Sequence, residues 1–434
     1  MIAAPPLLLL ALLGPPDDAE PRSESVRVVA ITASPEPEAE PEPEPTAPLE
    51  LAPRAPEPEP EPARTWQFEL FADIAYVVNS NLPDNHVTRG FVTIPRSGEI
   101  TPNMVGAFIR HPVNDAEPWW FELGIHAGPA VDALVAAEPT PGGAESRYAG
   151  VEVFKHIALA NVGVRIRKSK TSIGAGVFES PIGLSSFWSY RNPNYTPMWQ
   201  GNATPYYLAG ARVSQTIPGG LTLSGWVVNG FQTYADANKV PSGVLSLAYD
   251  HPKPREHIRA LNLTTNLYVG PEGPSIKPED WLILSDTVVT WQMNPRFALA
   301  GVWDVGIENP GRRKADQNFY MAGGLLARGT LVERDEVRLE LALRPDVVWD
   351  RDGRFLGVPQ WLLSGTASAN LWLWDHLLLR AEYRFDQSTA AAGFFYRGAA
   401  TTDDGPGLAQ RQHSVLFSLT GLWDFWFGRH AKPN

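Results

Sequence analysis

The stretch from His376 to Asp386 alternates apolar and polar side chains along its whole length. Successive side chains of an extended strand point to opposite faces, so its apolar residues share one face and its charged residues share the other. This pattern fits a soluble β-sandwich with its charged face in water, or a membrane barrel with its apolar face in lipid. The number of strands and the lengths of their connections distinguish these two folds.

The same two-residue period recurs between Trp66 and Phe427 and predicts about sixteen strands, with few helical segments between them. The predicted strands are residues 66–79, 104–111, 119–128, 157–167, 171–181, 204–215, 221–231, 240–250, 258–269, 281–293, 297–307, 319–330, 336–344, 361–374, 377–386 and 413–427.

The predicted connections alternate between long and short, except that the seventh to ninth are unclear. Long loops at one rim and tight turns at the other, with both termini on the tight-turn side, are typical of bacterial outer-membrane barrels. Tryptophans near predicted strand ends fit interfacial girdles: Trp119, Trp120, Trp281, Trp291, Trp361, Trp372, Trp374, Trp423 and Trp426. We therefore predict an all-β, transmembrane, antiparallel up-and-down barrel over residues 66–427, with both termini in the periplasm.

The N-terminal segment has a different composition. Its apolar run up to Gly14 is shorter than the about 20 residues of a membrane-spanning helix and has the length of a signal-peptide core. We therefore predict a signal peptide over residues 1–25. It is atypical because no basic residues precede the apolar run, and a buried helix is the alternative. Residues 26–65, rich in Glu-Pro repeats, predict a disordered tether, and residues 428–434 predict a short tail.

Most of the negative charge belongs to the tether. Residues 1–65 carry 13 acidic and 4 basic residues, so their net charge is −9 of the chain's −12. The remainder is close to neutral, which argues against nucleic-acid binding and against a strongly charge-selective pore. The chain has no Cys, which excludes disulfides, thiolate zinc sites and thiol catalysis.

Charged residues of both signs occupy the predicted lumen face. Facing rows of opposite charge would favour polar solutes; alternatively, these residues only solvate the wall and pair across strands. We expect the pore to be lined by Arg165, Arg167, Arg212, Arg338, Glu340, Arg344, Arg380, Glu382, Arg384 and Asp386. We expect the fifth connection, residues 182–203, to fold inward as a constriction with Glu179, Arg191 and Tyr195, rather than to stay an exposed loop.

Motifs of the common enzymes are absent from the sequence. It contains no His-Glu-x-x-His metal motif, no Gly-x-Ser-x-Gly elbow and no phosphate-binding glycine loop. We therefore predict no catalytic residues, no metal and no cofactor. An outer-membrane hydrolase with a His–Ser pair, using His126 or His413, is the alternative.

Several short motifs occur in a characteristic order. Gly176–Gly183 reads Gly-Val-Phe-Glu-Ser-Pro-Ile-Gly and is followed by Asn192–Thr196, Gly210–Arg212, Val228–Gly230, Leu267–Glu272 and Arg384–Ser388. This ordered set resembles the OmpL-like β-barrel porin-2 family over roughly residues 66–427. The resemblance implies an outer-membrane porin.

Together these features predict passive diffusion of small hydrophilic solutes, because sixteen strands enclose a water-filled channel. The expected partners are outer-membrane lipid, the solutes and, by analogy with other sixteen-stranded porins, two further copies in a homotrimer. A substrate-specific channel is one alternative. The other is a barrel that anchors the tether to peptidoglycan or to another periplasmic partner, although the tether also fits an inert spacer.

Overall fold

The structure is a computed structural model that describes residues 65–114, 116–136, 154–236, 238–251, 260–272, 277, 281–402 and 405–427. All described residues belong to one compact unit of the chain, Glu61–Asn434. The predicted signal peptide, the predicted tether up to residue 64 and the predicted tail lie outside the described residues.

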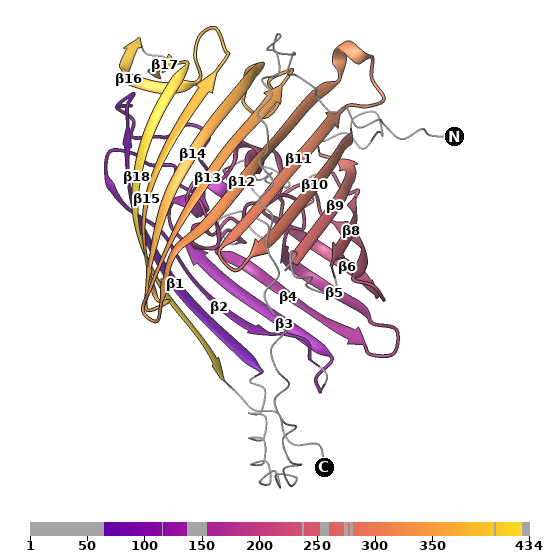
Figure 1. Cartoon of the computed structure of the whole chain (residues 1–434). Helices are drawn as coiled ribbons and strands as arrows, with labels where there is room; N and C mark the ends of the chain where they lie inside the picture. Colours follow the sequence, from indigo (N-terminus) through magenta and orange to yellow (C-terminus); the bar gives the residue numbers. More distant parts are fainter. Residues whose placement is uncertain are drawn as a thin grey trace, which may run out of the picture. The chain divides into compact units, whose positions relative to one another are not determined.

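Sixteen of the strands in the described part close into an antiparallel barrel, as Figure 1 shows. The strands are β1 (Trp66–Asn79), β2 (Ile100–His111), β3 (Trp119–Ala127), β4 (Ile157–Ile166), β5 (Thr171–Glu179), β6 (Tyr207–Ile217), β7 (Leu221–Val228), β8 (Ser242–Asp250), β9 (Ala260–Pro271), β10 (Trp281–Asn294), β11 (Phe297–Glu308), β12 (Asn318–Arg334), β13 (Val337–Asp350), β14 (Gln360–Leu373), β15 (Leu377–Ser388), β16 (Phe395–Thr402), β17 (Gly405–Ala409) and β18 (Arg411–Phe427).

The first and last barrel strands close the ring. β1 pairs with β18 from Trp66 opposite Phe427 to Asn79 opposite Ser414, and β18 also pairs with β15. β16 and β17 form a separate hairpin between β15 and β18. The prediction of about sixteen barrel strands is confirmed, and each predicted segment overlaps one of them. The hairpin was missed, because residues 387–412 were predicted as one loop.

The connections sort onto two rims. Those that follow β1, β3, β5, β7, β9, β11, β13 and β15 form what we call the long-loop rim, and the others form the tight-turn rim with the start of β1 and the end of β18. The tight turns include residues 295–296 and 335–336, whereas the loop after β5 covers residues 180–206. The unclear seventh and ninth connections follow β7 and β9 and therefore lie on the long-loop side of the strand order.

Side chains alternate between the lumen and the outer surface as the two-residue period predicts. On β1, Phe71 and Asp73 face inward and are each 1% exposed, whereas Leu70 and Ile74 face outward at 41% and 42%. Large apolar residues are exposed in this way on strands around the whole barrel. Such an apolar outer belt fits lipid, and the closed ring leaves no unpaired strand edge in it.

Aromatic side chains gather at both rims. At the tight-turn rim, Trp66 packs on Trp119 and Phe427 with ring centroids 6.0 and 6.4 Å apart. At the long-loop rim, Trp349 stacks on Trp361 at 5.2 Å. Trp120 differs from its predicted place in a girdle: its position on β3 faces the lumen, and its indole N–H donates to Asn161 within the barrel.

Two prolines misled the prediction of strand ends. The predicted second strand began at Met104, but β2 already begins at Ile100, because a shift of register against β1 between Asp73 and Ile74 accommodates Pro102. A bulge of this kind tolerates the missing N–H of proline. Likewise, β13 continues to Asp350, beyond the predicted end at Arg344, with Pro345 paired opposite Gly365.

Several loops of the long-loop rim contain short helical elements, and the loop after β5 packs inside the barrel. They carry the helix α1 (Pro129–Leu134) and the 3-10 turns η1 (Ser189–Arg191), η2 (Trp199–Ala203) and η4 (Lys314–Asp316). Three buried apolar clusters form against the inner wall, and each contains a residue of the loop after β5: Trp188, Trp199 and Ile182. Within the part of the chain that the structure describes, no helix has the length and apolar character needed to cross a membrane.

Candidate functional site

Residues 180–206, which connect β5 and β6, run inside the barrel and are called the inward loop below. Tyr195, Met198 and Trp199 of this loop are at most 1% exposed. A loop without a ladder of its own leaves backbone N–H and C=O groups that need partners when they are buried. The charged residues of the inner wall supply many of these partners.

Arginines of β15 bind carbonyl groups of the inward loop. Arg380 donates to the carbonyl oxygens of Ser189 and Asn192 at 3.1 and 2.9 Å. Arg384 donates to the carbonyl oxygen of Pro197 at 2.6 Å. A guanidinium group offers five N–H donors in a fixed plane, so one arginine satisfies several carbonyl groups of an irregular segment.

A glutamate between these arginines binds the opposite type of backbone group. Glu382 accepts hydrogen bonds from the backbone N–H groups of Tyr195 and Thr196 at 2.6 and 3.0 Å. Arg344 on β13 donates to the carbonyl groups of Thr196 and Pro197. The mixed signs of this wall therefore match the two polar groups of a peptide backbone.

This arrangement differs from the predicted role of these residues as a water-exposed lining. Arg344, Arg380, Glu382, Arg384 and Asp386 are between 0% and 4% exposed. The inward loop covers them, because it lies directly on β13 to β15 and fills this side of the lumen. We call these five residues the charged face.

Asp73 on β1 holds the tip of the inward loop. It accepts hydrogen bonds from the phenol of Tyr195 and from Thr420 on β18, the latter at 2.7 Å. Asn103 donates to Tyr195 at 2.9 Å, and it is the residue that the bulge of β2 adds opposite β1. Burial raises the pKa of the Tyr195 phenol, and the charge of Asp73 raises it further, so this phenol remains a donor.

The predicted constriction residue Arg191 points to a second group of charges. Its guanidinium lies 3.0 Å from Glu69 and 3.4 Å from Glu179. Glu69 also pairs with Arg110 at 3.1 Å and accepts a hydrogen bond from Tyr190. The structure thus brings Arg191 and Glu179 together, whereas Tyr195 lies with Asp73 at a separate contact.

A third contact lies on β10 and β11, on lumen-facing positions that the sequence analysis did not single out. Asp286 and Asp304 face each other across the two strands. Asp286 accepts from the backbone N–H of Gly183 at 3.1 Å and from Asn266 at 2.7 Å. Asp304 accepts from the side chain of Gln200 at 2.5 Å. A lone Asp at an alternate position in each apolar strand was the available signal.

Arg212 lies on the opposite wall, away from the charged face. Its guanidinium carbon is 5.2, 4.8 and 5.3 Å from the ring centres of Trp120, Phe178 and Trp226. Cation–π contact with three rings fixes this side chain on the wall formed by β3, β5, β6 and β7.

The remaining predicted lining residues lie toward the tight-turn rim. Arg338 is 3.6 Å from Glu340 on the same strand and 3.5 Å from Asp375 in the next turn. Arg165 is half-buried near the end of β4. Arg167 lies beyond that strand and donates to the carbonyl oxygen of Ala116, so it belongs to the rim rather than to the lining.

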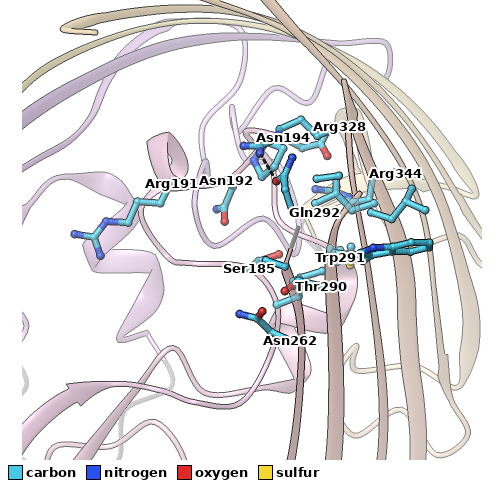
Figure 2. Close-up of a pocket in the computed structure, with 18 residues that line it drawn as sticks. Ser185, Arg191, Asn192, Asn194, Asn262, Thr290, Trp291, Gln292, Arg328 and Arg344 are labelled. Atoms are coloured by element: carbon cyan, nitrogen blue, oxygen red, sulfur yellow. Dashed lines mark hydrogen bonds between the residues drawn. The ribbon is translucent and has the colours of Figure 1, made fainter. Parts of the chain in front are cut away.

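Two cavities lie beside the inward loop. The tight-turn-side cavity has a volume of about 310 Å³. Figure 2 shows polar side chains of the loop and of the facing wall around it: Ser185, Asn192, Asn194, Asn262, Thr290 and Gln292. The long-loop-side cavity has a volume of about 340 Å³, and Asn202, Gln232, Glu272, Glu308 and Arg354 are among its lining residues.

Six of the residues that line the tight-turn-side cavity carry amide or hydroxyl groups. Amide and hydroxyl groups exchange hydrogen bonds with water and with uncharged polar molecules. Among the described residues, no three His, Cys, Asp or Glu side chains are grouped so that they would hold a metal ion.

Several solved structures are similar to this chain over most of its length. Similar solved structures include the anion-selective porin from Comamonas acidovorans, with 10% identity, a TM-score of 0.48, and coverage of 84% of this chain and 100% of that one. Salmonella typhi OmpF in complex with daunomycin has 10% identity, a TM-score of 0.47, and coverage of 82% and 97%. The outer membrane channel DcaP of Acinetobacter baumannii has 10% identity, a TM-score of 0.45, and coverage of 82% and 96%.

The comparison with protein families is more specific. No curated protein matches the chain. The family model described as "Putative beta-barrel porin-2, OmpL-like" matches residues 65–420, which include β1 and most of β18. The resemblance inferred from the short motifs is therefore confirmed, and the chain belongs to the OmpL-like β-barrel porin-2 family.

Proposed function

We propose that this outer-membrane porin lets small hydrophilic solutes diffuse passively past the inward loop, between the loop and the wall of β9 to β12. The observation that carries the proposal is the amide- and hydroxyl-rich lining of the tight-turn-side cavity. Arg191, Arg328 and Arg344 also line it, and each forms an ion pair, with Glu69, Glu340 and Asp346 respectively. Such a lining favours polar solutes with weak preference for the sign of their charge.

Single-channel recording in planar bilayers tests this proposal. The purified, refolded full chain is expected to give discrete conductance steps and a reversal potential near zero across a salt gradient. Stable insertion without conductance steps would contradict passive diffusion. A strong and saturable effect of one added solute on the conductance would instead favour the substrate-specific alternative.

Orientation in the membrane is a second part of the proposal. We infer that the tight-turn rim faces the periplasm, because outer-membrane barrels combine short periplasmic turns with longer external loops. An epitope inserted in the loop after β11 would then be accessible on intact cells, and one in the turn after β12 would not. The reverse result would invert the orientation.

Assembly into a homotrimer, a cell-wall partner of the tether and the absence of catalysis are further parts of this proposal. A channel family and a polar lumen support transport rather than catalysis. The homotrimer and a cell-wall partner of the tether stay predictions; chemical cross-linking in membranes tests the first. Deletion of residues 35–62 tests the second, since loss of envelope integrity with unchanged uptake would indicate an anchoring role.

A further inference from the structure

The acid pair Asp286 and Asp304 is unusual among the buried charges of this barrel. Both residues are 0% exposed, and they occupy directly opposed positions on β10 and β11. Side chains at directly opposed positions of neighbouring strands lie close together, so the two carboxyl groups are placed to share a proton. Full ionisation of both would place like charges together in a site that is closed to solvent.

No cation compensates this pair within the described residues. Its donors are the backbone N–H of Gly183 and the side-chain amides of Asn266 and Gln200. Oδ1 of Asp304 is buried and receives no N–H or O–H donor from the described chain, so a proton shared with Asp286 would give it a partner.

Groups on the neighbouring strands do not supply the missing positive charge. Tyr320 on β12, paired opposite Gly306, donates to the carbonyl of Ala203, and Tyr268 on β9 donates to Glu272. Toward the long-loop rim lie the acidic residues Glu308 and Asp350, with Arg354 bound to Glu308 at 2.7 Å. Across the loop, Arg344 pairs with Asp346 on β13 at 3.3 Å.

The pair also lies between the two cavities. On β10, Leu282 lines the long-loop-side cavity and Thr290 lines the tight-turn-side cavity, with Asp286 midway. On β11, Glu308 and Ala300 line the two cavities in the same way, with Asp304 midway. Gly183 and Gln200 therefore attach both ends of the inward loop to the wall at the point that separates the two spaces.

We propose that Asp286 and Asp304 share one proton that keeps both ends of the inward loop on β10 and β11, and that loss of this proton to solvent releases the loop. Repulsion between the two carboxylates then separates them, one side chain turns away with its loop contact, and the cavities join into a wider path. The inference rests on the proposed porin function, because the wider path matters only if solutes pass.

Channel recordings at a series of pH values test this device in the full-length protein. If one proton controls release, the ratio of wide to narrow openings rises up to about tenfold per pH unit through the transition. Asp304→Asn keeps the shape of the side chain and donates to Asp286 without a proton to lose. This variant is expected to stay in the narrow state at every pH, while Asp335→Asn in an exposed turn behaves like the wild type.

A second readout does not depend on conduction or on the folding of that variant. The chain has no Cys, so Ser185→Cys, two residues from Gly183, introduces a single thiol on the inward loop. Relative to a free thiol at each pH, its labelling rate should rise through the same transition, and Asp286→Asn added to it should remove the rise. A barrel that shows this pH-dependent labelling but no conductance would support the release of the loop and contradict only the diffusion pore.

Three results would overturn the proposal. One is a wild-type ratio and labelling rate that do not change with pH. Another is an unchanged pH dependence in both Asp304→Asn and Asp286→Asn. The third is release by a divalent-metal chelator at constant pH, because the pair would then share a bound cation such as Ca²⁺ rather than a proton.

Discussion

The inward loop contacts the wall of the barrel on two sides, and the buried charges of these two sides have different partners. On the charged face, Arg384 lies 2.8 Å from Asp386, and Arg344 lies 3.3 Å from Asp346. On β10 and β11, two carboxyl groups face each other with only amides as donors. Paired charges keep their protonation over a wide range of pH, whereas an unpaired acid pair depends on one proton. One side is therefore suited to permanent attachment and the other to release.

Removal of Glu382 breaks the permanent side and has the largest expected effect. Glu382→Ala leaves two loop N–H groups without their acceptor and leaves Arg380 and Arg384 with one fewer buried counter-charge. Loss of one member of a buried, hydrogen-bonded charge network costs about 3–5 kcal/mol. Urea unfolding in lipid vesicles measures this loss in the free energy of unfolding, with Glu336→Ala in an exposed turn as control. A loss no larger than that of the control would mean that the charged face does not hold the loop.

Tyr195→Phe weakens the contact between the loop tip and β1 by a smaller amount. The phenol donates to Asp73 and accepts from Asn103, and both partners are buried. A buried polar group that loses its partner costs about 1–3 kcal/mol. The same unfolding assay measures it against Tyr76→Phe, which changes an outward-facing tyrosine. Equal midpoints for the two variants would show that the tip is held by packing alone.

Arg328→Gln tests the lining of the tight-turn-side cavity without changing a residue at either attachment of the inward loop to the wall. Its side chain is 37% exposed and its guanidinium lies 4.0 Å from Glu340, so the variant removes one positive charge from the lining. The reversal potential should shift toward cation preference, and conductance should change by less than about twofold, because a partly solvated charge is screened by salt. A shift toward anions would contradict the assigned path.

Glu99→Gln is expected to have the smallest effect. Arg96 donates to Glu99 at 2.6 Å and holds the pKa of its carboxyl below the usual range. A lowered pKa means that the contribution is present at neutral pH and lost as the pH falls through the acidic range. Because this pair is exposed, Glu99→Gln should leave the unfolding midpoint unchanged both at neutral pH and at acidic pH. A clear difference between the effects of the variant at neutral and at acidic pH would mean that the loop after β1 contributes more to stability than expected.

Much of the fold follows from the alternation of side chains, because a barrel strand has one lipid face and one lumen face. The short helix α1 and the β16–β17 hairpin escaped prediction, since they lie in loops where no such period operates. Pro102 and Pro345 marked false ends, because a bulge and continued pairing beyond the proline keep the strands intact.

The candidate site was only half predictable. The lumen-facing positions of Arg380 and Glu382 follow from the period of β15, but their burial does not. It depends on a loop more than 180 residues earlier in the chain. The same reason hid Asp286 and Asp304, whose importance becomes visible only when Gly183 and Gln200 lie against them.

These long separations along the chain also set an order of events during folding. Tyr190 and Glu69 are 121 residues apart, Tyr195 and Glu382 are 187 apart, and the ring itself closes between its first and last strands. Contacts between distant segments form slowly, because chain entropy is lost before they are gained. The inward loop therefore reaches its final place only as the cylinder closes around it, and the last step of biogenesis sets the dimensions of the passage.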